Sequence, residues 1–209
     1  MKQVLYSGYY PDDGYPFHTL AKDVVTAKLP EDIIEPDSIL VIWGGSDINP
    51  ALYGHEQSLR TYPGGRRDYI EWDLIQKAIM LDIPIIGVCR GAQMLCAAAG
   101  GYLIQHVDNH TGSHHKVDTI DGTSFTVNSI HHQMMCVPEE VDHVRLAITD
   151  KPRSQRYIYQ KDREHNPVAE LEAVWFPTLK GLAIQWHPEA MDDGSDATKF
   201  IMEKIDAYF

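Results

Sequence analysis

One cysteine in this sequence stands where a strand would turn sharply into a helix. Cys89 follows the apolar run 83–88 and lies in the segment GVCRG, flanked by Gly87 and Gly91. A nucleophile between two glycines is typical of a tight strand-to-helix turn, in which side chains on the neighbouring residues would clash. The N-terminus of the following helix favours a thiolate. The pattern predicts that Cys89 is a nucleophile and that the backbone N–H of Arg90 binds a developing oxyanion.

A histidine and a glutamate near the end of the chain could serve this nucleophile. A thiolate mechanism needs a base, and the base needs a group that orients it. His187 and Glu189 are two residues apart, and in extended chain such side chains point the same way. Pro188 between them restricts the backbone. We therefore expect Glu189 to hold one imidazole nitrogen while the other faces Cys89, which gives a Cys89–His187–Glu189 triad.

The alternative is that Cys89 is a small core residue, because cysteine is among the most buried residue types. That interpretation suits Cys96, which lies inside an expected helix, and Cys136. For Cys89, the glycine pair, the strand–helix context and the strand-ending His-Pro-Glu together favour the nucleophile. The chain has three cysteines without paired spacing. We therefore expect no disulfide framework and a cytoplasmic, reducing location.

The elements that must position these residues alternate in the first half of the chain. Strands are expected at 4–8, 38–43 and 83–88, and helices at 18–27, 68–81 and 92–99. Such alternation favours a parallel α/β sheet with helices on both faces. The run 38–43 reads SILVIW, as expected of a strand that is buried on both faces. The long loop 45–66 that follows is of a length that is usually functional.

The second half of the chain is richer in expected strands. They lie at 119–130, with a turn at Asp121-Gly122, and at 145–149, 156–160, 171–176 and 181–186, before a final helix at 197–209. His187 follows the strand at 181–186. It would therefore share a sheet edge with Cys89 if that strand and 83–88 are parallel. With neither repeat nor linker, residues 1–209 are expected to form a single domain.

Composition excludes several classes of function. The formal net charge of −12 over 209 residues argues against a nucleic-acid partner, which would require clustered Lys and Arg. No stretch approaches the roughly 18 apolar residues that span a bilayer, and the start of the chain is unlike a secretory signal. We expect no nucleic-acid or membrane partner.

Five motifs together resemble the class I glutamine amidotransferase superfamily, and within it the γ-glutamyl-γ-aminobutyrate hydrolase-like branch, peptidase family C26. They occur in order as WGGSDINPALYG from residue 43, RDYIE from residue 67, GVCRGAQ from residue 87 with a later GG, NSIHHQ from residue 128, and QWHPE from residue 185. The resemblance implies a flavodoxin-like three-layer α/β/α sandwich with a mostly parallel central sheet. Residues 150–167 form a charged, aromatic loop that does not match the branch.

The resemblance also implies roles for particular residues. Cys89 would be the nucleophile, His187 the base and acid, and Glu189 the orienting group. The remaining implied positions are the oxyanion hole at Gly44, Gly45 and Arg90, the glutamyl contact Gln93, and the pocket-lining Ser129 and His131. The implied reaction is cleavage of a γ-glutamyl amide through a γ-glutamyl thioester, without a cofactor.

Three functions stay open at this stage. The first is a free-standing hydrolase of a small γ-glutamyl substrate, and the second is a glutaminase that passes ammonia to a separate synthetase or ligase. The third is a non-catalytic binding protein on the same fold, against which the complete triad weighs. A homodimer is left open, and the sequence does not identify the leaving amine.

Two further groups of charged or imidazole side chains have alternative interpretations. Arg66 and Arg67 could bind a substrate carboxylate, or could form a salt bridge with Asp68 or Glu71 at the start of a helix. A second group gathers histidines and an aspartate: His106, Asp108, His110, His114 and His115. Histidine clusters can bind metal, but this spacing matches no known ligand pattern. A turn-rich surface loop is therefore favoured and no metal is expected.

Overall fold

A nine-stranded mixed sheet forms the centre of the computed structural model, which describes residues 3–7, 14–33 and 37–209. Across the sheet the strands are β2 (Asp23–Thr26), β1 (Gln3–Ser7), β3 (Ser38–Ile42), β4 (Ile85–Val88), β13 (Gly181–Ile184), β12 (Leu171–Phe176), β10 (Val144–Thr149), β7 (Thr111–Thr119) and β8 (Ser124–Ile130). Neighbours are parallel from β2 to β13 and antiparallel from β13 to β8. The strand expected at 4–8 is confirmed as β1, but Gly8 lies outside the described residues.

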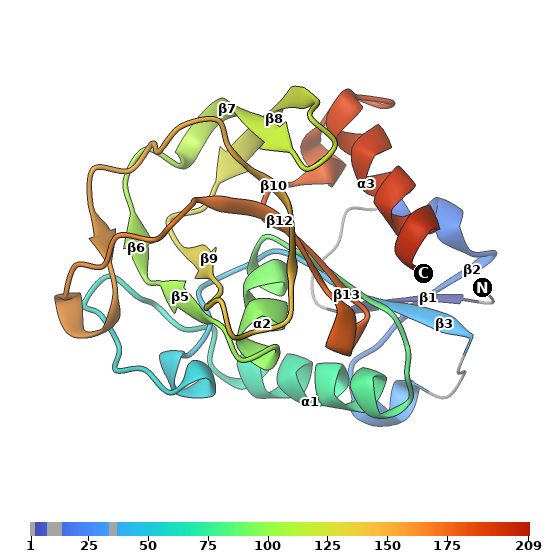
Figure 1. Ribbon diagram of the computed structural model, residues 1–209. Helices are drawn as coiled ribbons and strands as arrows, with labels where there is room; N and C mark the ends of the chain where they lie inside the picture. Colours follow the sequence, from blue (N-terminus) through green and yellow to red (C-terminus); the bar gives the residue numbers. More distant parts are fainter. Residues whose placement is uncertain (1–2, 8–13, 34–36) are drawn as a thin grey trace.

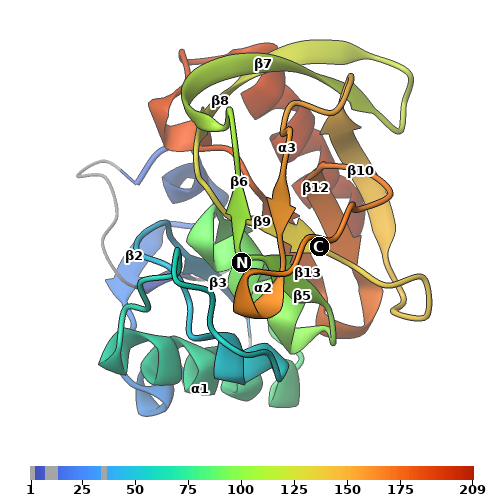
Figure 2. The ribbon, with the colours of Figure 1, turned by 90° about the vertical axis from the view of Figure 1, so that its left-hand side faces the viewer.

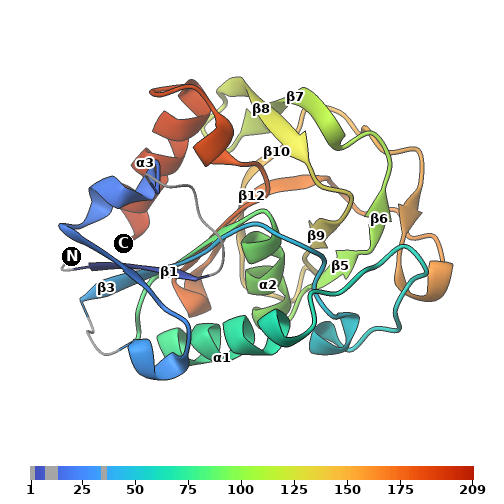
Figure 3. The same cartoon turned by 180° about the vertical axis from the view of Figure 1, so that it is seen from behind.

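Helices cover both faces of the sheet, as predicted. The helices α1 (Arg66–Met80) and α2 (Arg90–Ala98) pack on one face, and α3 (Asp196–Tyr208) packs on the other (Figures 1 and 3). The apolar side chains divide into two main buried clusters that follow these faces. The central strands β3, β4 and β13 are buried at every residue, because both of their faces are covered. The predicted α/β/α fold is therefore confirmed.

The antiparallel half of the sheet extends away from α1. Figure 2 shows β7 curving across the top of the molecule, while α1 lies at the bottom. The expected turn at Asp121-Gly122 joins β7 to β8, and Gly122 has a φ of 76° there. Phe125 of β8 packs on Phe200 of α3 at a ring-centroid distance of 5.3 Å. Two small two-stranded ribbons complete the described strands: β5 (Tyr102–Ile104) with β9 (Met134–Cys136), and β6 (His106–Val107) with β11 (Tyr157–Ile158).

One expected helix is wrong. The segment 18–27 forms a short 3₁₀ turn at Phe17–Leu20, followed by the edge strand β2. The β-branched residues Val24, Val25 and Thr26 favour extended backbone, and they pair in parallel with β1. Val24 and Val25 are 42% and 39% exposed, so this edge strand lacks the apolar signature that identified the central strands.

Most of the remaining expected elements are observed with small shifts at their ends. The strand β7 was not expected before residue 119, and only residues 157–158 of the strand expected at 156–160 are extended. The helices expected at 68–81, 92–99 and 197–209 are observed as α1, α2 and α3. The loop expected at 45–66 contains one 3₁₀ turn, Pro50–Tyr53. Within the part of the chain that the structure describes, no helix is long and apolar enough to cross a membrane.

Candidate active site

Cys89 occupies a strained turn between β4 and α2. Its φ of 51° and ψ of −103° are rare for a residue other than glycine, and such strain persists only when the surroundings enforce it. Its N–H donates to the carbonyl of Ile184 at 2.7 Å, which ties the turn to β13. A Cβ on Gly87 would lie 2.4 Å from the carbonyl oxygen of Gly91, and one on Gly91 would lie 1.9 Å from that of Ile42. The turn therefore requires both glycines.

The register of the sheet brings His187 to the same edge. In the parallel pair β4–β13, Val88 lies opposite Ile184, so the chain leaves both strands at one level. His187 Nδ1 lies 2.7 Å from Glu189 Oε1. A Cβ built on Gly44 would lie 2.8 Å from His187 Cε1 and 3.7 Å from Cys89 Cβ. The loop after β3 therefore approaches both side chains closely.

These contacts set the charge of the histidine. Burial by itself lowers the pKa of His187, because it disfavours the charged form. Hydrogen bonds to Cys89 and Glu189, together with the negative charge of those groups, outweigh burial and raise the pKa of His187 to about 10. The imidazole is therefore protonated at neutral pH in this arrangement, beside a cysteine that is only 6% exposed.

Asn128 is a residue of this site that sequence reasoning did not single out. Its side-chain Nδ2 donates to the carbonyl of His187 at 2.8 Å, and its Oδ1 accepts from the N–H of His187, also at 2.8 Å. The amide of one β8 residue thus fixes the backbone of the histidine on both sides. The signal was present in the NSIHHQ motif, but only the folded chain shows what Asn128 contacts.

A buried ion network lies beside the turn. The Arg90 side chain is 1% exposed and is bonded to Glu71 and, at 2.5 Å, to Asp68. Arg67 Nε donates to Glu71 at 2.8 Å, and its Nη2 donates to the carbonyl of Gly44 at 3.0 Å. Of the two alternatives for Arg67, the structure therefore favours the ion pair. The network links α1 to the loop after β3 and to the first residue of α2.

The backbone near Cys89 has N–H groups at the start of α2. The first hydrogen bond of the helix runs from Gln93 N–H to the carbonyl of Cys89, at 3.1 Å. The N–H groups of residues 90–92 come before it and are therefore not used inside the helix. The amide of Arg90 is one of them, as the sequence suggested. Gly45, in the loop after β3, has a φ of 156°.

The expected substrate-binding side chains are all buried. Gln93 Nε2 donates to the carbonyl of Gln133 at 3.0 Å, and His131 Nδ1 lies 2.9 Å from the same oxygen. Ser129 donates to the carbonyl of His110. Among the described residues, no hydrogen bond joins Ser129 or His131 to Cys89 or His187. Burial holds the pKa of His131 well below its usual value, so its ring is neutral.

The histidine-rich segment is not the turn-rich surface loop that was expected. Residues 106–107 form β6 and 111–119 form β7, which is paired on both sides. His110 and His115 are 1% and 4% exposed, whereas the neighbouring His114 is exposed. Alternation along β7 buries His115, and only the position of the strand inside the sheet could reveal this.

Comparisons with known proteins agree with the fold. The sequence profile of the Peptidase C26 family matches residues 26–120. The glutamine amidotransferase-like protein YvdE of Lactococcus lactis is 30% identical over 187 residues, which are 78% of this chain and 71% of that protein. The carbamoyl phosphate synthase small chain of Zymomonas mobilis is 26% identical over 136 residues, 61% of this chain and 32% of that one.

Solved structures share the fold at low sequence identity. The structure of PurLQS from Thermotoga maritima matches with a TM-score of 0.65 at 14% identity, covering 99% of this chain and 98% of that chain. Because YvdE is matched over more than two thirds of its length at 30% identity, we conclude that this chain belongs to the glutamine amidotransferase-like family.

Proposed function

We propose that this protein is a cysteine-dependent hydrolase that cleaves the γ-glutamyl amide bond of glutamine or of a γ-glutamyl-amine. The observation that carries the proposal is that His187, which is bonded to Glu189 at 2.7 Å, lies at the same sheet edge as Cys89. Cys89 and Glu189 outweigh burial and raise the pKa of His187 to about 10. A protonated histidine beside a cysteine on a strained turn suits a thiolate nucleophile with an acid ready to protonate the leaving group. Membership of the family supports hydrolysis or transfer of an amide in general terms.

The proposed reaction has two halves. In the first, the sulfur of Cys89 attacks the γ-carbonyl carbon, while the N–H groups of Arg90 and of Gly44 or Gly45 bind the oxyanion. His187 then gives its proton to the leaving nitrogen, so that ammonia or an amine departs and a γ-glutamyl thioester remains. In the second half, neutral His187 takes a proton from water, and the resulting hydroxide attacks the thioester. Glutamate leaves and the protonated His187 with the Cys89 thiolate is restored.

Three further residues have proposed roles in binding. We place the glutamyl group of the substrate near the side chain of Gln93, which lies on α2, directly after Cys89. We place Ser129 and His131, which are both buried, in the layer behind the pocket that would hold this group. The neutral ring of His131 suits that role, since it adds no positive charge next to His187. The free cysteines favour a cytoplasmic location.

An alternative is a glutaminase that works with a separate synthetase or ligase. It is favoured by the similarity to the carbamoyl phosphate synthase small chain and to the PurLQS structure, whose names denote parts of larger enzymes. In that case the same thioester chemistry would release ammonia to a second chain. A homodimer remains a further proposal for the assembly.

Glutamate release from two kinds of substrate tests these functions. The purified protein is incubated with glutamine and with γ-glutamyl-amines. We expect turnover of γ-glutamyl-amines without any partner, and loss of at least about a thousandfold in Cys89→Ser. Cys136→Ser is the matched control and should retain activity. Turnover of glutamine that appears only with a synthetase would support the alternative.

Covalent labelling gives an independent check. A glutamine-like diazoketone should modify Cys89, whereas Cys96 and Cys136, which are buried away from the turn, serve as internal controls. Full activity in Cys89→Ser, or labelling confined to the other two cysteines, would refute the proposed mechanism. Absence of both turnover and labelling would favour a non-catalytic binding protein.

A further inference from the structure

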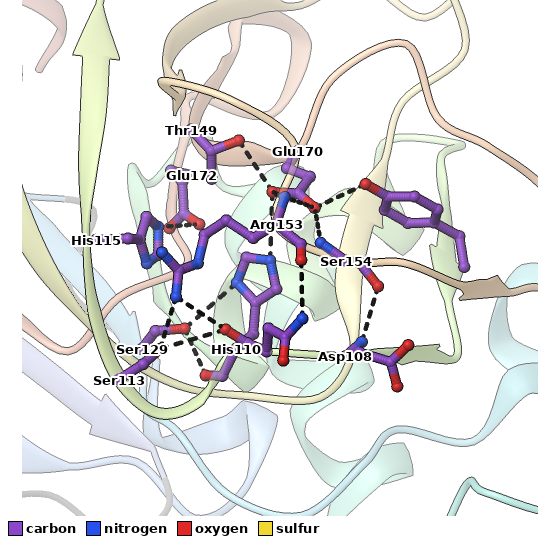
Figure 4. A network of polar contacts seen from close by, with 12 residues as sticks. Asp108, His110, Ser113, His115, Ser129, Thr149, Arg153, Ser154, Glu170 and Glu172 are labelled. Atoms are coloured by element: carbon purple, nitrogen blue, oxygen red, sulfur yellow. Dashed lines mark hydrogen bonds and ion pairs between the residues drawn. The ribbon is translucent and has the colours of Figure 1, made fainter.

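A cluster of buried histidines and glutamates lies outside the proposed triad, where β7, β10 and β12 meet (Figure 4). His110 and His115 come from the segment around β7, and Glu170 and Glu172 come from the start of β12. All four side chains are at most 4% exposed. Four titratable groups removed from water together require a partner of opposite charge or a ligand.

The geometry of three of these residues suits a cation. The candidate ligand atoms of His110, His115 and Glu172 all lie within 4.8 Å of one another. His115 Nε2 lies 2.9 Å from Glu172 Oε1. Two imidazoles and one carboxylate form a donor set that holds zinc in proteins.

Hydrogen bonds within the protein do not complete this cluster. Glu172 Oε2, His115 Nδ1 and His110 Nε2 are buried and have no hydrogen-bond partner. The contact of His110 Nε2 with Glu170 Oε2, at 3.3 Å, is an ion-pair distance without hydrogen-bond geometry. Unsatisfied polar atoms are uncommon in protein interiors, and one explanation for them is an ion that binds there.

Glu170 differs from Glu172 because it is already well supplied with donors. It accepts from Thr149 Oγ1 at 3.0 Å, from Tyr157 Oη at 2.8 Å and from the backbone N–H groups of Arg153 and Ser154. A carboxylate held in this way already has hydrogen-bond donors from the protein. Glu172, by contrast, retains an oxygen without a hydrogen-bond partner for a ligand.

Arg153 is the arginine drawn in this network in Figure 4. Its Nη2 donates to the carbonyl of Asn109 at 3.1 Å and to Ser113 Oγ at 3.3 Å. Among the described residues, its side chain makes no hydrogen bond or ion pair with Glu170 or Glu172. The guanidinium is hydrogen-bonded to the loop before β7 and to β7 itself, and not to the carboxylate of Glu172.

We propose that His110, His115 and Glu172 bind a divalent transition-metal cation, for which zinc fits the donor set best. The spacing of the histidines gave no such indication, because Glu172 lies 57 residues from His115 in the sequence. The metal would join the β7 segment to β12. It would lie close to Ser129, because the hydroxyl of Ser129 donates to the carbonyl of His110. Its role would be structural and separate from the thioester chemistry.

Zinc titration tests the proposal without reference to activity. Chelator-treated protein in a Cys89→Ser background is titrated with ZnCl₂ by calorimetry, and bound metal is counted after dialysis. We expect one zinc per chain and a rise in the thermal midpoint. His115→Gln and Glu172→Gln should each weaken binding at least about tenfold, since outer ligand changes alone cost that much. His114→Gln is the matched control, because its ring is exposed on the same strand, and it should bind like the parent.

Cobalt spectroscopy tests the proposal even if a ligand variant fails to fold, because it uses a protein in which the proposed ligands are unchanged. Co²⁺ bound to the Cys89→Ser protein should give visible bands of nitrogen and oxygen ligation, without the intense near-ultraviolet band of a sulfur ligand. A sulfur band would place the metal on Cys96 or Cys136 and overturn the proposal. The absence of saturable zinc binding, or equal losses in His114→Gln and His115→Gln, would overturn it as well.

Discussion

At the scale of single residues, Asn128 holds the backbone of His187 in position. Its amide is hydrogen-bonded to both the N–H and the carbonyl of His187, so it fixes the backbone that carries the ring without touching the reacting atoms. This makes Asn128 a positioning residue. Such a residue should influence the rate of the chemical step more than the affinity for substrate.

We expect Asn128→Ala to lower kcat about tenfold to a hundredfold and to leave KM nearly unchanged. Losing two buried hydrogen bonds costs about 1–3 kcal/mol, and each 1.4 kcal/mol or so is a factor of ten in rate. Steady-state kinetics measure both constants. Asn166→Ala, at an exposed asparagine, is the control. A variant that loses only stability, with unchanged kcat, would contradict the positioning role.

The charge of His187 gives a prediction for pH dependence. Its pKa is raised to about 10 by Cys89 and Glu189 despite burial. The protonated form, and the stability it contributes, is therefore fully present below the unfolded pKa of about 6.5 and is lost as the pH rises through about 10. We expect the alkaline limb of kcat/KM to follow the same titration.

Glu189→Gln tests the cause of that titration. Glutamine can still accept a hydrogen bond from the imidazole but carries no negative charge, so the alkaline limb should move to lower pH. The measurement is the pH profile of kcat/KM for both proteins. An alkaline limb that does not move in Glu189→Gln would show that another group titrates there.

At the scale of elements, the turn between β4 and α2 depends on how closely it approaches β3. We expect Gly91→Ala to destabilise the protein by about 3 kcal/mol or more, because its Cβ would lie 1.9 Å from the backbone oxygen of Ile42. Gly181→Ala is the matched control, since the nearest atom to its Cβ is at 3.4 Å. Urea unfolding measures both, and similar losses in the two variants would contradict the steric argument.

The ion network that joins α1 and α2 is a second element-scale feature. Glu71→Gln removes the charge that faces both Arg67 and Arg90, which leaves the 1%-exposed Arg90 poorly compensated. We expect a loss of about 3 kcal/mol. The exposed Glu203→Gln should stay within about 0.5 kcal/mol of the parent. A Glu71→Gln protein of unchanged stability would indicate that the network is not needed to hold the two helices together.

At the scale of the whole molecule, one sheet joins the two halves of the site. The parallel half supplies Cys89 after β4, and the antiparallel half supplies Asn128 on β8, while His187 follows β13, where the two halves meet. Because strand pairing is continuous from β2 to β8, we expect residues 1–209 to unfold as a single domain. Tryptophan fluorescence and circular dichroism should then report the same urea midpoint. Two separated transitions would contradict the single-domain prediction.

The elements that the sequence predicted well are those with strong local signatures. The runs at 38–43 and 83–88 are continuously apolar because both faces of these strands are covered, and that condition is visible in any short window. The edge strand β2 was mistaken for a helix because its residues are half-exposed and its pairing partner β1 lies outside the window. For the same reason, the burial of His115 was not foreseen.

By itself, the sequence determined the family, the fold class and the three residues proposed as a triad, since Cys89 and the His187-Pro188-Glu189 segment each follow an apolar strand with its own local pattern. Only the tertiary structure decided what supports them. Asn128 lies 59 residues from His187, and Glu172 lies 57 residues from His115. Contacts between residues so far apart produce no periodic pattern in the sequence, because they depend on the register of strands that pair only when the chain folds.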